Sequence, residues 1–188
     1  MLIIGITGTL GAGKGTIVDY LTKEKGFTHF SVRAYLITEI EKQGMPVNRD
    51  SMMLVANGLR TKHSPSFIID ELYQRALASQ KHCIIESIRT PGEVESLNEK
   101  GNFYLFAVDA DPKLRYERIF TRNSETDRID YETFLENEQR EMDANDPNKQ
   151  NLRKCIEMAD FVFNNNGSIK TLQQQVETTL ELILKQTV

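Results

Sequence analysis

The sequence has no tryptophan, only two cysteines among its 188 residues, and no long apolar run. Cys83 and Cys155 lie far apart and lack CxxC spacing, so we expect two reduced thiols in a reducing compartment. The longest apolar stretches, Leu2–Ile6 and Phe103–Val108, fall far short of the roughly 20 residues that span a bilayer. No basic segment precedes the first of them, so we expect a cytoplasmic protein without a signal peptide or a membrane partner.

An excess of basic residues is also absent. The sequence has 23 Lys and Arg residues and 27 Asp and Glu residues, which gives a net charge of −4. Non-specific affinity for a phosphate backbone needs a basic face, so we expect no nucleic-acid partner, although a local basic cleft is compatible with this balance. The three histidines lack HxxxH or HExxH spacing, so we expect no metal site built from histidine and cysteine. The length and the ordinary content of apolar residues (39%) predict one globular domain over residues 1–188.

Short apolar runs alternate with longer amphipathic segments. The predicted strands are Leu2–Ile6, His29–Val32, His82–Glu86, Phe103–Asp109 and Phe161–Asn164. Helix starts are indicated by a capping box at residues 90–93 and by the Ser-Pro and Asp-Pro pairs at 64–65 and 111–112. Residues 168–185 carry an apolar stripe at helical spacing. The alternation predicts an α/β fold: a three-layer, doubly wound sheet of five parallel strands with helices on both faces.

Two segments exceed a minimal strand–helix alternation. Residues 33–80 hold too much helical sequence for one crossover and break around residues 44–46. Residues 123–158 are densely charged and contain few large apolar residues, which predicts low local stability. This second segment admits two interpretations, a solvated helical hairpin or, over residues 123–148, a mobile lid. In the lid interpretation Arg128 and Arg140 close over the transferring phosphates.

A glycine-rich turn follows the first predicted strand and precedes a helical stretch. It reads Gly8-Thr9-Leu10-Gly11-Ala12-Gly13-Lys14-Gly15-Thr16. Glycines let successive N–H groups surround phosphate oxygens, and the helix N-terminus adds partial positive charge, so this context predicts a P-loop. Lys14 can reach the β- and γ-phosphates of ATP, and the Thr16 hydroxyl can join the shell of Mg²⁺. The general pattern has a hydroxyl directly after the lysine, whereas Gly15 intervenes here.

The Gly-Lys-Gly-Thr ending resembles the P-loop of adenylate kinase and related nucleoside monophosphate kinases. The segments 29–36, 85–90 and 114–122 are similar to further motifs of that family and follow in the same order. The end of the chain, residues 159–168, is similar both to adenylate-kinase-related proteins of archaea and to dephospho-CoA kinases. The resemblance implies a nucleotide-kinase type of P-loop fold with a helical lid, ATP and Mg²⁺ as cofactors, and a small-molecule nucleotide as the acceptor.

The resemblance also assigns roles to individual residues. Residues 33–80 become the acceptor-binding helical insert. The candidate catalytic residues are Lys14, Glu86, Arg89, Arg118 and Arg122, and those for ATP are the loop residues Gly8, Gly11, Ala12, Gly13, Lys14, Gly15 and Thr16 together with Arg118. Arg33, Arg60 and Arg89 are the candidates for the acceptor, and Thr16 and Glu86 those for Mg²⁺. Arg118 and Arg122 fall one turn apart on a helix, so both guanidinium groups can converge on one ligand.

Departures from the family leave the acceptor open. Ile37 stands where adenylate kinases have an arginine, and Glu86 replaces an aspartate, so specificity for AMP does not follow. No acidic residue occurs between Phe27 and Thr38, which counts against a dephospho-CoA-kinase-like transfer to a hydroxyl because that chemistry needs a nearby carboxylate. A P-loop NTPase acting as a switch or assembly factor is the third alternative. Tyr35 is predicted as a core residue.

Overall fold

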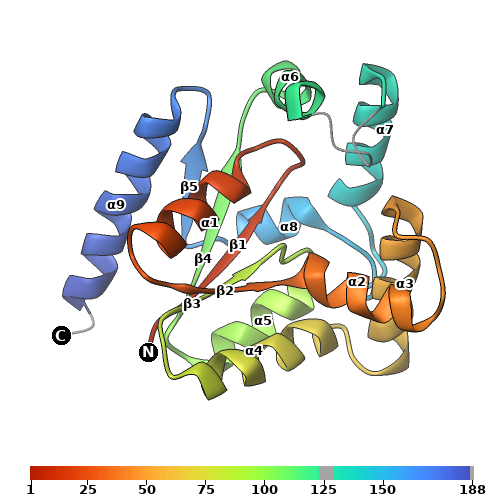
Figure 1. Cartoon of the computed structure of the whole chain (residues 1–188), viewed down its shortest axis with the longest axis horizontal. Helices are drawn as coiled ribbons and strands as arrows, with labels where there is room; N and C mark the ends of the chain where they lie inside the picture. Colours follow the sequence, from red (N-terminus) through yellow and green to blue (C-terminus); the bar gives the residue numbers. More distant parts are fainter. Residues whose placement is uncertain (123–128, 187–188) are drawn as a thin grey trace.

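Five parallel strands form one sheet in the order β2-β3-β1-β4-β5 in the computed structural model, which describes residues 1–122 and 129–186 (Figure 1). The strands are β1 (Ile3–Gly8), β2 (Thr28–Ser31), β3 (Cys83–Glu86), β4 (Phe103–Asp109) and β5 (Phe161–Asn164). Each strand ends within two residues of its predicted bounds. The predicted doubly wound α/β fold is therefore confirmed.

β1 lies at the centre of the sheet, where Ile3 is in register with Cys83 of β3 and with Phe103 of β4. All pairs in this sheet are parallel, so the carboxyl ends of the strands meet at one edge. In open parallel sheets ligands bind at that edge, next to the point where the strand order reverses. Here this point lies beside β1, because the chain goes from β1 to β2 and β3 on one side of it and then passes to β4 and β5 on the other.

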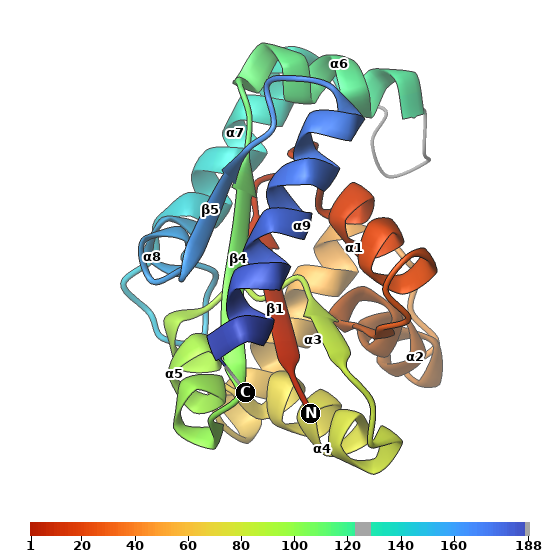
Figure 2. The ribbon, with the colours of Figure 1, turned by 90° about the vertical axis from the view of Figure 1, so that its left-hand side faces the viewer.

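Alternate residues of the central strand supply two hydrophobic cores. Leu2, Ile4 and Ile6 pack on one face with α1 (Lys14–Lys23) and α9 (Ile169–Gln186). Ile3 packs on the other face, which α4 (Phe67–Ser79), α5 (Pro91–Lys100) and α8 (Leu152–Glu157) cover. Figure 2 shows α1 and α9 on one side of the strands and α5 and α8 on the other. A fully buried isoleucine stabilises such a core by about 1.5–3 kcal/mol relative to its exposed state.

The segment 33–80 forms α2 (Val32–Lys42), α3 (Arg49–Lys62) and α4. The Ser31 and Asn48 side chains cap α2 and α3 by accepting hydrogen bonds from backbone N–H groups of their first turns. The expected break falls between α2 and α3, where Gly44 takes a φ of 67°. Tyr35 is buried in the core, as predicted, with the Arg75 guanidinium over its ring.

Beyond β3, helix starts follow the predicted signals closely. The capping box of Thr90 and Glu93 opens α5, and Pro112 opens α6 (Pro112–Arg122). Before β3, the helix expected at Ser64-Pro65 begins at Phe67, two residues after the proline. Cys83 and Cys155 are both buried and free. No helix among the described residues is long and apolar enough to cross a membrane.

The charged segment after α6 is better anchored than its composition predicts. It holds α7 (Tyr131–Met142) and α8, and Phe134, Leu152 and Cys155 are buried. Phe134 packs against the rings of Tyr116 and Tyr131, and α8 contacts β1 and β4. The interpretation as a solvated hairpin is therefore wrong for α8 and for the inner face of α7. Composition misled because Phe134, Leu152 and Cys155, although few, all fall on the buried sides of these helices.

Candidate active site

The loop between β1 and α1 is shaped by three glycines with positive φ, Gly8 (138°), Gly11 (79°) and Gly13 (111°). A Cβ on Gly8 would overlap the carbonyl oxygen of Val108, and one on Gly13 would overlap the side-chain amide of Asn165. The backbone of β4 at Gly8 and the Asn165 side chain at Gly13 thus approach too closely for any other residue. These glycines fix a loop whose N–H groups can surround an anion.

Gly15 behaves differently from the other loop glycines. It is exposed, its φ is not positive, and no atom lies within 4 Å of the position that its Cβ would take. Neither the backbone nor the packing of the described residues therefore requires a glycine here. The open space lies at the N-terminus of α1, where the helix dipole favours a phosphate.

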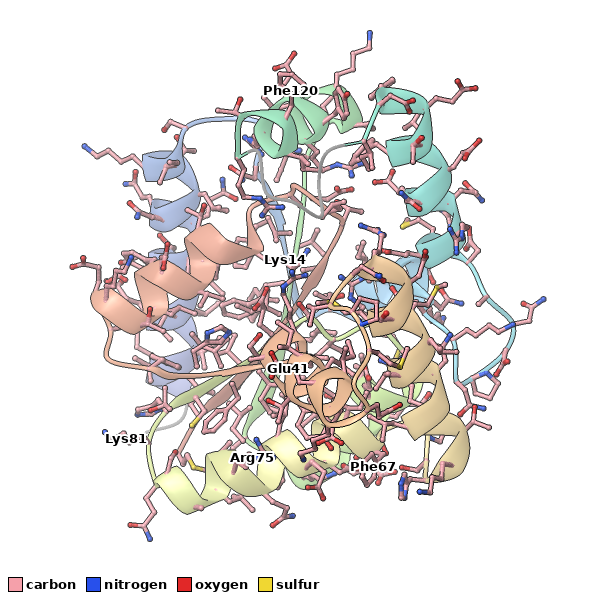
Figure 3. All side chains as sticks on the ribbon, turned by 45° about the vertical axis from the view of Figure 1, so that its right-hand side comes forward. Lys14, Glu41, Phe67, Arg75, Lys81 and Phe120 are labelled. Carbon is pink, nitrogen blue, oxygen red and sulfur yellow. The ribbon has the colours of Figure 1, made fainter. Side chains whose placement is uncertain are left out.

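Lys14 is held above the loop by two backbone carbonyl groups. Its Nζ donates to the carbonyl oxygens of Gly8 and Thr9, each at 2.8 Å. Burial and the nearby Arg89 guanidinium lower the pKa of Lys14 to about 8, although the Glu86 carboxylate opposes the shift. In Figure 3 Lys14 lies in the middle of the molecule, between α1 on one side and α3 and α7 on the other.

The candidate magnesium ligands, Thr16 and Glu86, line one cavity with Lys14. Glu86 ends β3 and lies 3.2 Å from Nε2 of His29. Burial raises the pKa of Glu86, but the hydrogen bond from His29 and the charge of Lys14 outweigh it, so the pKa is lowered. Among the described residues no three His, Cys, Asp or Glu side chains cluster as a metal site. Thr16 and Glu86 together fit Mg²⁺, which usually takes one or two protein ligands, waters and substrate phosphates.

Ser87, directly after Glu86, has a φ of 74°, which is unusual for a residue with a side chain. Its N–H donates to the carbonyl oxygen of Ile6 at 2.9 Å, so the turn after β3 is tied to the central strand. Such strain is typical of functional turns. The turn directs the chain so that Arg89, two residues after Ser87, lines the cavity.

Arg89 meets a carboxylate that the sequence did not single out. Its Nη1 donates to Oε2 of Glu141 at 2.8 Å and to Oε1 of Gln150 at 2.7 Å. Arg49 binds the other oxygen of the same carboxylate. Burial raises the pKa of Glu141, but Arg89 and Arg49 reverse the shift and hold it below its usual range. No motif marks Arg49 or Glu141, because the two residues meet only through the packing of α3 and α7.

Arg60, an acceptor candidate, is only 2% exposed. Its Nε and Nη2 donate to Oε1 of Glu93 at 3.1 and 2.8 Å, and Glu93 also completes the capping box of α5. The Nη1 atom of Arg60 has no hydrogen-bond partner within the described parts of the chain, and the residue lines the cavity. Arg60 therefore braces α3 against α5, and its acceptor role stays a prediction.

The arginines of α6 divide between the cavity and the core. Arg118 and Arg122 both line the cavity, and Nη2 of Arg118 donates to the carbonyl oxygen of Asn165 at 2.8 Å. Arg115, one turn earlier, is only 2% exposed and donates to the carbonyl oxygens of Ala110 and Leu10 at 2.8 and 3.2 Å. It also pairs with Glu138 of α7. Sequence spacing could not separate this structural arginine from the two at the cavity.

Of the two lid candidates, Arg128 and Arg140, the structure describes only Arg140. Arg140 lies on α7, is exposed, and lines the cavity close to Met53 of α3. Arg128 lies outside the described residues. Asp109, the last residue of β4, accepts from the Thr9 hydroxyl at 2.5 Å and from the Ala110 N–H at 2.8 Å. It thereby ties the end of β4 to the glycine-rich loop.

These elements enclose one cavity of about 710 Å³ at the carboxyl edge of the sheet. Among the described residues, eight basic and three acidic side chains line it: Lys14, Arg33, Arg49, Arg60, Arg89, Arg118, Arg122 and Arg140, against Asp50, Glu86 and Glu141. One wall is apolar and is built by α2 and α3 from Val32, Leu36, Met52, Met53 and Ala56. The cavity thus combines strong positive potential with an apolar wall.

Residues 4–146, about three quarters of the chain, match the model of the AAA_18 family, an AAA domain. The chain is also 31% identical to a UPF0200 protein of Methanococcus maripaludis, over 98% of this chain and 99% of that relative. The chain belongs to the UPF0200 family. A UPF0200 protein of Methanocaldococcus jannaschii is 28% identical over 98% of this chain and 91% of its own length.

Two solved structures are similar in fold to this UPF0200 member. A gluconokinase from Sinorhizobium meliloti has a TM-score of 0.63 at 14% identity, covering 99% of this chain and 95% of its own. A shikimate kinase from Acinetobacter baumannii, in complex with shikimate, has a TM-score of 0.56 at 16% identity, covering 100% and 96%. The fold of this UPF0200 member is thus that of P-loop kinases.

Proposed function

We propose that the protein transfers the γ-phosphoryl group of ATP to the phosphate of a (deoxy)nucleoside monophosphate. The observation that carries the proposal is the charge of the cavity, eight basic residues against three acidic ones in a chain of net charge −4. Positive charge concentrated in a concave site draws in and stabilises anions. Two phosphorylated substrates, bound together, supply enough negative charge to match it.

On the donor side, the N–H groups of the glycine-rich loop bind the β- and γ-phosphates and Lys14 exchanges its two carbonyl partners for phosphate oxygens. Thr16 and Glu86 are the side chains that would hold Mg²⁺ or its waters. When bound, the ion would supply neutralisation of the negative charge on the triphosphate. Arg118 and Arg122 reach the same space from α6 and stabilise the charge that develops on the transferring group.

On the acceptor side, Arg33, Arg49 and Arg89 line the part of the cavity formed by α2, α3 and the turn after β3. The apolar wall between α2 and α3 suits the flat face of a base. A phosphate acceptor is already ionised, so transfer needs positioning and charge neutralisation rather than a strong base. The lowered pKa values of Glu86 and Glu141 agree with this, because both carboxylates are weak bases.

A hydroxyl acceptor is the second candidate, and Glu86 is the observation that favours it. Its carboxylate lines the cavity near Lys14 and stays ionised, so it can accept a hydroxyl proton. Structural neighbours named as a gluconokinase and a shikimate kinase point the same way. A dephospho-CoA-kinase-like reaction belongs to this class.

An acceptor panel tests the proposal. ADP release is measured with ATP and Mg²⁺ alone, and then with each (deoxy)nucleoside monophosphate, dephospho-CoA, gluconate and shikimate. We expect turnover only with a monophosphate, and a loss of at least about 10²-fold in Lys14→Ala, as for other residues that stabilise transferring charge. Turnover with a hydroxyl acceptor refutes the phosphate acceptor, and acceptor-independent hydrolysis at the full rate indicates a switch NTPase.

The magnesium role of Thr16 has its own test. Thr16→Ala is expected to raise the Mg²⁺ concentration needed for half-maximal turnover more than it weakens nucleotide binding, because it removes the hydroxyl that would join the metal shell and leaves the backbone N–H groups of the loop in place. An unchanged Mg²⁺ titration removes Thr16 from the metal site.

A further inference from the structure

A carboxylate of the chain itself lies between two arginines in the cavity. Glu141, on the last turn of α7, binds Arg49, the first residue of α3, with one oxygen. Its other oxygen accepts from Nη1 of Arg89 at 2.8 Å. Gln150 accepts from the same Nη1 at 2.7 Å. Two helices, α3 and α7, and two loops, after β3 and after α7, therefore meet around a single negative group.

The Glu141 carboxylate occupies a position suited to an anion, and its contacts are not needed to keep α7 in place. The helix is already anchored by the buried Phe134 and by Glu138, which pairs with the buried Arg115. The two arginines that bind Glu141 remain partly open to the cavity, with 31% of the Arg49 and 26% of the Arg89 side chain exposed, whereas Glu141 has 11% of its side chain exposed. A ligand entering the cavity thus meets both guanidinium groups.

The loop behind Arg89 is fixed as well. The backbone N–H of Asn151 donates to the carbonyl oxygen of Arg89 at 2.9 Å, so Gln150 and Arg89 stay together when Glu141 leaves. Lys14 is close enough for its charge to act on Glu141, which places this anion position beside the phosphate loop.

We propose that Arg49 and Arg89, positioned by Gln150, form the binding site for the phosphate monoester of the acceptor, and that Glu141 fills it as an internal anion until the ligand displaces it. The inference rests on the proposed function for the identity of the acceptor. A phosphate monoester carries up to two charges and three terminal oxygens, so it can take paired hydrogen bonds from both guanidinium groups. A carboxylate offers one charge and two oxygens, and is the weaker partner.

The test measures binding rather than turnover. The P-loop is first saturated with a non-hydrolysable ATP analogue and Mg²⁺, so that the added anion cannot bind there. Inorganic phosphate is then titrated calorimetrically into wild type, Glu141→Gln, and Glu141→Gln combined with Arg49→Gln. Glu136→Gln is the matched control, because Glu136 is exposed on the same helix and the same charge is lost. Thermal unfolding of each variant verifies that it is folded.

We expect Glu141→Gln to bind phosphate at least ten-fold more tightly than wild type, Glu136→Gln to match wild type within two-fold, and the added Arg49→Gln to abolish the gain. Equal or weaker binding by a folded Glu141→Gln overturns the inference. If Glu141→Gln does not fold, amide exchange of residues 131–142 in wild type decides. Faster exchange on adding phosphate supports displacement, and unchanged or slower exchange overturns it.

Failure of the proposed function and failure of this inference give different experimental results. Tighter phosphate binding without any transfer to monophosphates refutes the proposed function and leaves the anion site standing. Transfer to monophosphates with unimproved binding in Glu141→Gln refutes only the internal anion.

Discussion

Nucleotide binding is expected to draw a proton onto Lys14 at alkaline pH. In the structure without ligand, burial and Arg89 lower the pKa of Lys14 to about 8 from a usual value of 10.5. Phosphate oxygens in place of two carbonyl partners favour the charged amine and return its pKa toward or above the usual value. The nucleotide phosphates are already ionised in this range, so they do not contribute the change.

The size of the effect follows from this shift. With a pKa of about 8 in the free protein and about 10.5 in the complex, binding takes up about 0.9 proton at pH 9 and about 0.1 at pH 7. Nucleotide affinity is therefore expected to fall by about six-fold per pH unit on average between about pH 8 and 10.5, because Lys14 must then be protonated on binding.

Calorimetry of ADP binding in buffers of different ionisation enthalpy measures the proton number directly. Lys14→Arg is the matched control, because arginine keeps the charge and does not titrate in this range. We expect its proton uptake at pH 9 to fall close to zero while binding persists. Uptake below about 0.3 proton in wild type, or equal uptake in Lys14→Arg, would refute the assignment of the lowered pKa to Lys14.

Two further predictions concern stability. Gly13→Ala is expected to destabilise the fold by about 1–3 kcal/mol in chemical denaturation, because it forces a side chain to a φ of 111° and against a buried amide. Gly15→Ala should change the unfolding free energy by no more than about 0.5 kcal/mol. It should weaken nucleotide binding instead, since the new methyl group fills only the space that the ligand would occupy. Equal losses of stability in Gly13→Ala and Gly15→Ala would contradict this prediction. Glu93→Gln should cost about 3–5 kcal/mol, because the Arg60 guanidinium then stays buried without its counter-charge. The exposed Glu95→Gln is the control, and a loss below about 1 kcal/mol for Glu93→Gln would show that Arg60 finds another partner.

The features that sequence reasoning recovered are those encoded locally. The alternation of apolar strands and amphipathic helices predicted the sheet, and the glycine pattern before Lys14 predicted the turn that opens α1. Capping signals such as Thr90 with Glu93 act over three residues, so they can be found without knowing the fold.

The acceptor side of the cavity could not be predicted in the same way. Arg49 and Glu141 are 92 positions apart and meet only because α3 and α7 face the same cavity. Arg115 and Arg118 look alike in sequence, yet one is buried against Glu138 and the other lines the cavity. Which arginine is buried depends on the angle at which α6 packs, and a single sequence carries no direct signal of that angle.

The central position of β1 has a consequence for how the chain is made. β1 leaves the ribosome before the strands that pair with it, because both of its neighbours, β3 and β4, begin about 80 or more residues later. At ordinary rates of translation this delay lasts about 4–16 s. Throughout it, six residues that end fully buried lack their sheet partners on both edges. The nascent chain therefore carries an apolar strand with two open edges, and its yield in the cell depends on how well that strand is shielded before β3 and β4 arrive.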